Sequence, residues 1–135
     1  MNDIYIIHTS ANDATATRIC FAFQAAGIGS WVDHIHGSEN SFSIRQEREE
    51  ALNSCAASVL ILSEWSALSS RCTCEWQRTL EQGKRLVVAV AEEFPPDDIP
   101  QELWNRTIVY VDLSQDVESG IDSLIRVFAA GHIPS

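Results

Sequence analysis

The chain has 135 residues, 45% of them apolar and 21% charged, so length and composition predict one globular domain over residues 1–135 with its own hydrophobic core. The 19 acidic residues outnumber the 9 lysines and arginines, and the net charge of −10 disfavours binding to the phosphate backbone of nucleic acids. No apolar run approaches the about 20 residues that a membrane-spanning helix needs, so we expect neither nucleic acid nor a membrane as a partner.

The cysteine pattern and the N-terminal residues predict a cytoplasmic protein. The four cysteines follow no disulfide framework, and Cys72 and Cys74 have no second close pair with which to hold zinc. The apolar run Ile4–Ile7 is too short for the core of a signal peptide, and the acidic Asp3 precedes it. We therefore expect reduced thiols and no secretory leader.

Strand-like and helix-like segments alternate along the chain. In chain order, we first expect a strand at Ile4–His8, a helix at Asp13–Ala26, a strand at Ile28–Val32, a loop at His34–Ser41, a helix at Ser41–Leu52 and a strand at Val59–Leu62. We then expect a serine-rich loop at Ser63–Arg71, a helix at Cys72–Gln82, a strand at Leu86–Val90, a loop at Glu92–Pro100, a strand at Thr107–Val111 and a helix at Val117–Ala130. The expected N-caps are Asp13 and Ser41, and the expected helix stops are Gly27, Gly83, Gly131 and Pro134.

This alternation favours an α/β fold, a single flavodoxin-like domain whose parallel sheet is covered by helices on both faces. The leading strand order is 2-1-3-4-5, which leaves a crevice between the loops that follow strands one and three. One loop carries His8, Thr9 and Ser10, and the other is Ser63–Arg71, with Glu75 close behind it. We therefore expect the functional site at this crevice.

Five sequence pieces occur in a characteristic order. They are an acid, apolar strand and polar turn ending in Asp (Asp3–Asp13), a strand ending in Asp (Trp31–Asp33), a loop ending in Ser-Phe (His34–Phe42), a Leu-Ser followed later by Cys-x-x-Glu (Leu62–Glu75), and Gln-Gly-Lys (Gln82–Lys84). Together they span about the whole chain and resemble the Toll/interleukin-1 receptor (TIR) domain family, most closely its bacterial members. The loop His34–Phe42 matches the family's BB loop, without its usual proline.

The resemblance implies an enzyme that cleaves NAD⁺ at the bond between nicotinamide and ribose, with Glu75 as the catalytic residue. A carboxylate at this place stabilises the ribosyl cation, and nicotinamide leaves without a general acid. NAD⁺ is then the substrate, and no cofactor and no metal are expected. The expected substrate-binding residues are His8, Thr9, Ser10, Asp33 and Arg71.

Arg71 departs from the family pattern, which has an aromatic residue just before the cysteine. Its guanidinium either lies beside the nucleotide, where it repels the nicotinamide ring and favours the phosphates, or it points to solvent and pairs with an acid. In the second case Trp65 is the better candidate for the aromatic wall of the site.

Several of these residues also have purely structural interpretations. A glutamate near a helix start, such as Glu75, gains about 0.3–1 kcal/mol from the helix dipole. A pair of histidines such as His34 and His36 is more often solvated than metal-binding, so these two are expected to be solvated loop residues. Arg45 and Glu49 are spaced for an ion pair on a solvated helix face.

The resemblance also implies that the site is completed when TIR domains stack, so other TIR domains are the expected partners. His36, Gly37 and Phe42 of the BB loop are the expected contact. The context would be defence or cell-death signalling, with the sensor in a separate domain or chain.

Two alternatives come from different classes of protein. A non-catalytic TIR adaptor acts only by assembly; Arg71 favours this function, whereas Glu75 favours the enzyme. A phosphate-accepting receiver domain of the same fold is disfavoured, because strand three ends in Leu62-Ser63 rather than in an aspartate.

Overall fold

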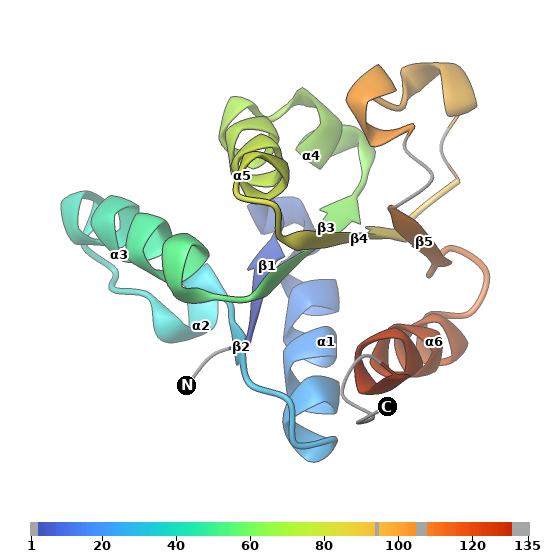
Figure 1. The fold of residues 1–135 in the computed structure, drawn as a ribbon, viewed down its shortest axis with the longest axis horizontal. Coiled ribbons are helices and arrows are strands. Elements are labelled where there is room, and N and C mark those ends of the chain that lie inside the picture. The colour runs from blue at the N-terminus through green and yellow to red at the C-terminus, as the bar shows by residue number, and fades with distance from the viewer. Residues whose placement is uncertain (1–2, 94, 105–107, 131–135) are drawn as a thin grey trace.

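A five-stranded parallel sheet forms the centre of the computed structural model, which describes residues 3–93, 95–104 and 108–130 (Figure 1). The sheet has the expected order β2-β1-β3-β4-β5. Its strands are β1 (Ile4–Ile7), β2 (Ser30–Trp31), β3 (Ala57–Leu62), β4 (Arg85–Val90) and β5 (Val109–Asp112). The helices are α1 (Asp13–Ala25), α2 (Asp33–His36), α3 (Ser41–Ser54), α4 (Glu64–Leu68), α5 (Ser70–Glu81) and α6 (Val117–Ala130).

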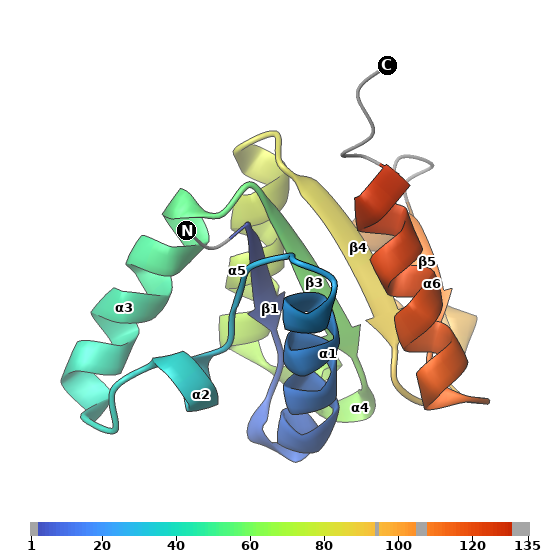
Figure 2. The same ribbon diagram turned by 90° about the horizontal axis from the view of Figure 1, so that it is seen from below.

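Two hydrophobic layers fill the space between the sheet and its helices. Helices α1 and α6 cover one face, and α3 and α5 cover the other (Figures 1 and 2). Because side chains alternate along a strand, Ile4 and Ile6 of β1 pack toward α1, whereas Tyr5 and Ile7 pack toward α5. Coverage of both faces explains why the central strands are continuous apolar runs.

The helix ends follow the sequence signals closely at the C-termini and less closely at the N-termini. Gly27 and Gly83 have φ angles of 78° and 70°, as expected of glycines that stop α1 and α5. Asn40, not Ser41, caps α3, because its side chain accepts the backbone N–H groups of Phe42 and Ser43. Asp13 is not a cap either; it is the first residue of α1, after a 3₁₀ turn at Ser10–Asn12.

Two segments expected to be loops contain short helices. The first part of His34–Ser41 belongs to α2, and Ser63–Arg71 forms α4 and the start of α5. Ser63 caps α4 by accepting the backbone N–H of Ser66 at 3.3 Å, while the Ser66 hydroxyl accepts the backbone N–H of Ser63 at 2.8 Å. Because α5 begins at Ser70, Glu75 lies in its second turn, so the helix-dipole argument for this glutamate is wrong.

The remaining differences are small. β2 is shorter than the expected Ile28–Val32, since only Ser30 and Trp31 pair with β1. The described residues between Glu92 and Pro100 are irregular apart from a 3₁₀ turn at Pro96–Asp98, and a further 3₁₀ turn follows at Gln101–Leu103.

Helix α6 has the expected bounds, and all four cysteines are free. Thr107, Gly131 and Pro134, which also entered the sequence predictions, lie outside the described residues. No helix in the described part of the chain is long and apolar enough to cross a membrane.

Replacement of the α3 cap should destabilise the fold. Asn40→Ala removes the acceptor of two backbone N–H groups, and we expect a loss of about 1 kcal/mol in the free energy of unfolding, measured by urea denaturation. Ser43→Ala is the matched control, because it leaves both of these bonds in place. Equal stability of Asn40→Ala and wild type would show that the cap contributes nothing.

Candidate functional site

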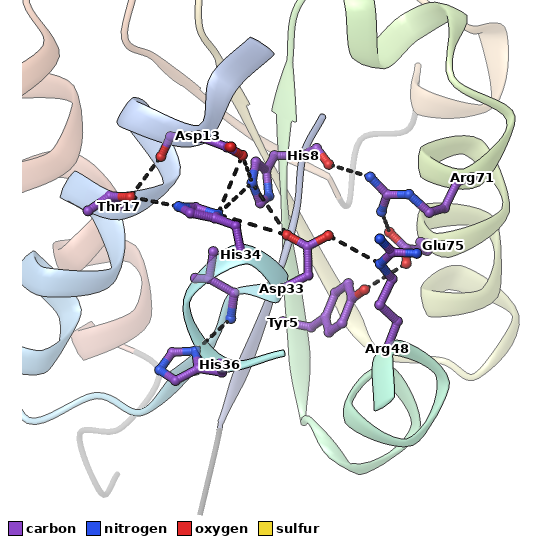
Figure 3. Close-up of polar contacts among 11 residues, drawn as sticks. Tyr5, His8, Asp13, Thr17, Asp33, His34, His36, Arg48, Arg71 and Glu75 are labelled. Carbon is purple, nitrogen blue, oxygen red and sulfur yellow. Dashed lines mark hydrogen bonds and ion pairs between the residues drawn. The ribbon is translucent and has the colours of Figure 1, made fainter. Parts of the chain in front are cut away.

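Glu75 is a buried carboxylate on α5 that faces Tyr5 of β1, and only 7% of the residue is exposed. Its Oε2 accepts a hydrogen bond from the Tyr5 hydroxyl at 2.6 Å, and its Oε1 accepts one from Arg71 Nη1 at 3.0 Å (Figure 3). Tyr5 is held in place by stacking on Trp31, with ring centroids 5.4 Å apart. Both oxygens of the carboxylate therefore have an internal donor.

Burial and pairing shift the pKa values of Glu75 and Arg71 in opposite directions. Burial raises the pKa of the Glu75 carboxyl above its usual value, while the hydrogen bond from Tyr5 and the charge of Arg71 oppose that rise. Burial and the neighbouring Glu75 raise the pKa of Tyr5, so the phenol remains a donor. Burial disfavours the charge on Arg71, but the charges of Glu75 and of further neighbours, among them Asp33, together outweigh this and raise the pKa of Arg71. The pair is thus a compact ionic contact in a region of low polarity.

Arg71 also connects α5 to the end of β1, because its Nη2 donates to the backbone carbonyl of His8 at 2.8 Å. It pairs with an acid, as one of the two sequence interpretations has it, but that acid is Glu75 and only 33% of the Arg71 side chain is exposed. The expectation that a paired Arg71 points to solvent is therefore wrong. Trp65 lies on α4 and is 61% exposed.

His8 is the centre of a second polar group. Its Nε2 lies 2.9 Å from Asp13 Oδ1, 3.1 Å from His34 Nδ1 and 3.6 Å from Asp33 Oδ1. Burial lowers the pKa of His8 below its ordinary value, and this outweighs the two aspartates, which raise it. His8 is therefore neutral near pH 7, and its buried Nδ1 has no hydrogen-bond partner among the described residues.

The structure brings the expected substrate-binding residues together around a hollow of about 500 Å³, here called the β1-end hollow. Thr9, Ser10, Asp33 and Arg71 line it, and His8 lies at its base through its contacts with Asp13 and Asp33. The Thr9 hydroxyl is buried and has no hydrogen-bond partner within the described part of the chain. The sequence prediction therefore grouped these residues correctly in space.

A second hollow of about 560 Å³ lies beside Glu75 and is lined by four arginines; we call it the arginine hollow. The arginines are Arg45, Arg48, Arg71 and Arg78. They are four of the nine basic residues of an acidic chain, so positive charge is concentrated at this place. The two hollows share Arg48 and Arg71, which makes them neighbours on the surface.

Several of these residues escaped the sequence prediction. The Arg48 Nε donates to Asp33 Oδ2 at 3.1 Å, and this arginine was recognisable as a charged residue in the core phase of its helix. Tyr5 was recognisable as a hydroxyl in an otherwise apolar strand. The expected pairing of Arg45 with Glu49 is absent among the described contacts, because Glu49 pairs with Arg78 at 3.4 Å.

A larger hollow, of about 760 Å³, lies at the carboxyl ends of β4 and β5, and Glu75 is not among its lining residues. Its lining includes the acidic Glu92, Glu93 and Asp112, which disfavour a ligand that carries phosphates. The candidate site is therefore identified by the arginines beside a buried carboxylate and not by the volume of the hollow.

The BB-loop residues have three different environments. Phe42 is 86% exposed at the start of α3, as an assembly contact requires. His36 accepts the backbone N–H of Val32 through its Nδ1 at 3.0 Å, so it stabilises its own turn. A Cβ at Gly37 would collide with the Asp33 carbonyl and with Ile44, although the backbone of Gly37 is extended.

Comparisons with known proteins agree with the observed fold. The sequence model of a family described as "TIR domain" matches residues 4–125. Among 28 matching chains of solved structures is the crystal structure of the TIR domain of the Toll-related receptor TRR-2 from Hydra magnipapillata. The two sequences are 16% identical, and the alignment covers 96% of this chain and 99% of the Hydra chain. The TM-score of 0.74 shows a common fold. A comparison with curated proteins finds no significant match.

Because Arg71 and Glu75 are in contact, the effects of replacing them on the free energy of unfolding should not be additive. Arg71→Met leaves a buried carboxylate without its cation, and we expect a loss of about 1–3 kcal/mol in the free energy of unfolding. Adding Glu75→Gln to Arg71→Met should cost much less than the sum of the two single changes, as measured by a double-mutant cycle in urea.

The control for this cycle is the exposed pair of Arg78 and Glu49, where Arg78→Met should change stability by less than about 0.5 kcal/mol. Additive effects of Arg71→Met and Glu75→Gln would contradict the structural account of the pair.

Proposed function

This chain belongs to the TIR domain family, and we propose that it cleaves NAD⁺ at the nicotinamide–ribose bond with Glu75 as the catalytic carboxylate. The observation that supports this most strongly is the placement of a buried acid beside a hollow lined by four arginines. A carboxylate suits a developing ribosyl cation, and arginines suit the two phosphates of a dinucleotide. In a chain with a net charge of −10, few surfaces offer both.

In the proposed reaction, the bond between the ribose C1′ and the nicotinamide nitrogen breaks, and its electron pair leaves with nicotinamide. Glu75 stabilises the resulting ribosyl cation. Water then forms the new bond at C1′ and loses a proton, which gives ADP-ribose; attack by a nitrogen of the adenine ring instead gives a cyclic product. Nicotinamide leaves as a neutral molecule, so a second acid is not required.

Arg71 controls access to Glu75 in this proposal. With Oε1 bound to Arg71 and Oε2 bound to Tyr5, neither oxygen is free to approach a substrate. A bound dinucleotide offers Arg71 a phosphate in place of the carboxylate, because Arg71 lines both hollows. The isolated chain is therefore expected to be a weak enzyme until ligand and neighbouring domains draw Arg71 away.

The alternative is a non-catalytic adaptor, and one observation favours it. The internal donors of Glu75 are sufficient to explain a buried glutamate by structure alone. Assembly is common to both functions, which act in signalling with other TIR domains and with a sensor in a separate domain or chain. The exposed apolar side chains available for assembly include Phe42, Trp65 and Leu68.

Loss of the Glu75 carboxylate should abolish NAD⁺ consumption. At matched high protein concentration, we expect Glu75→Gln to turn over NAD⁺ about 10²–10³-fold more slowly than wild type, with products identified by chromatography and mass spectrometry. Glu49→Gln is the control, because Glu49 lines the same hollow but is exposed and paired with Arg78. Equal turnover by Glu75→Gln and wild type would exclude Glu75 as the catalytic group, and an inactive wild type would favour the adaptor.

Self-association should depend on Phe42. Removing this exposed aromatic ring by Phe42→Ser should lower the mean mass of the wild-type assembly in light scattering, because its apolar area is the main hydrophobic contact that the BB loop offers. Phe21→Ser is the matched control, since Phe21 is also exposed but lies on α1. Assembly of Phe42→Ser at the wild-type concentration would place the interface elsewhere.

A further inference from the structure

The side chains of His8, Asp33 and His34 place metal-binding atoms within 4.8 Å of one another, and Asp13 of α1 contacts both histidines. In Figure 3 the rings of His8 and His34 lie between the carboxylates of Asp13 and Asp33. From this arrangement we infer that His8, His34, Asp33 and Asp13 form a binding site for a divalent transition-metal ion, best suited to Zn²⁺. The inference goes beyond the proposed NAD⁺ cleavage and does not rest on it.

The distances within this group are those of ligands around a small ion. His8 Nε2, His34 Nδ1 and Asp33 Oδ1 are separated by 3.1, 3.6 and 3.9 Å. Asp13 Oδ1 lies 2.9 Å from the first nitrogen and 3.4 Å from the second. Zinc–ligand bonds of about 2.0 Å in a tetrahedron place neighbouring ligand atoms about 3.3 Å apart. Small side-chain rotations are therefore enough to close both histidines and one aspartate around an ion, and the other aspartate supplies the fourth ligand when it turns toward the same point.

The hydrogen bonds of His34 already prepare its Nδ1 for a metal. The Thr17 hydroxyl donates to the backbone carbonyl of Asp13 at 2.8 Å, so His34 Nε2 must donate to Thr17 Oγ1, which lies 2.8 Å away. The proton of neutral His34 is thereby held on Nε2, and the lone pair of Nδ1 faces His8 and the aspartates. A second hydrogen bond that fixes the tautomer in this way is usual for histidine ligands.

The chemistry of the donors selects the class of ion. Two imidazole nitrogens and two carboxylate oxygens suit Zn²⁺ and similar transition metals, whereas Mg²⁺ and Ca²⁺ prefer oxygen ligands only. His8 must carry its proton on Nδ1 when Nε2 binds the metal, and this buried nitrogen has no acceptor within the described residues. We therefore expect weaker binding than in structural zinc sites whose histidines have such acceptors.

An ion at this place would join two segments that are distant in sequence, residues 8–13 and residues 33–34. It would hold the start of the BB segment against the end of β1. His8 and Asp33 would then be occupied as ligands, so the ion would also restrict the β1-end hollow.

Cobalt titration of tag-free protein tests the site directly. We would use the Cys74→Ser background, because Cys74 is the exposed thiol and thiolates also bind these metals. Wild-type ligands should give the intense visible absorption of tetrahedral Co²⁺ at one equivalent, which Zn²⁺ then displaces. At a Zn²⁺ concentration about 100-fold above the dissociation constant, the Tm should rise by about 5–10 °C.

The variants His34→Gln and Asp13→Asn should weaken Co²⁺ binding at least tenfold and remove the rise in Tm. Both side chains are partly exposed, so these variants should fold, which circular dichroism verifies. His36→Gln is the matched control and should bind as the background protein does, since His36 faces its own turn. Absence of the tetrahedral spectrum, or its persistence in both His34→Gln and Asp13→Asn, would overturn the inference.

Discussion

The burial of one carboxyl group, that of Glu75, determines how the site is built. Removing a glutamate from water costs several kcal/mol unless donors and a cation replace the lost hydration. Here Tyr5 and Arg71 do so, one on each oxygen of Glu75. This requirement explains the hydroxyl in an apolar strand, the stacking of Tyr5 on Trp31, and the direction of the Arg71 side chain.

The same contacts connect the two polar groups of the site. Arg71 reaches the His8 carbonyl, and His8 in turn contacts Asp13, Asp33 and His34. Asp33 also accepts a hydrogen bond from Arg48, which lines the arginine hollow. A substrate that binds near Glu75 therefore meets side chains that are already hydrogen-bonded to one another. The contacts that stabilise the fold are the same contacts that restrict access to the carboxylate. Release of Arg71 is the step at which ligand or assembly would act.

The strands and the last helix were predictable because apolar runs and helical periodicity are local signals. The order of the sheet followed from the rules for crossovers between parallel strands. The short helices α2 and α4 were not predictable, since segments of four or five residues are too short to show helical periodicity. Asn40 and Ser41 are equally good caps by residue type, so only the backbone distinguishes them. The crevice and Glu75 followed from topology and family resemblance, whereas the contacts of Tyr5, Asp13 and His34 join distant segments and have no signal in a single sequence.

In the mechanism that we propose, Arg71 covers Glu75 and yields it to a phosphate-bearing ligand. A crystal structure of the complex with ADP-ribose would show this exchange. We expect a ligand phosphate against Arg48 and Arg71, with the guanidinium of Arg71 beyond hydrogen-bonding distance of Glu75. A ligand bound elsewhere, or bound beside an unchanged contact between Arg71 and Glu75, would contradict it.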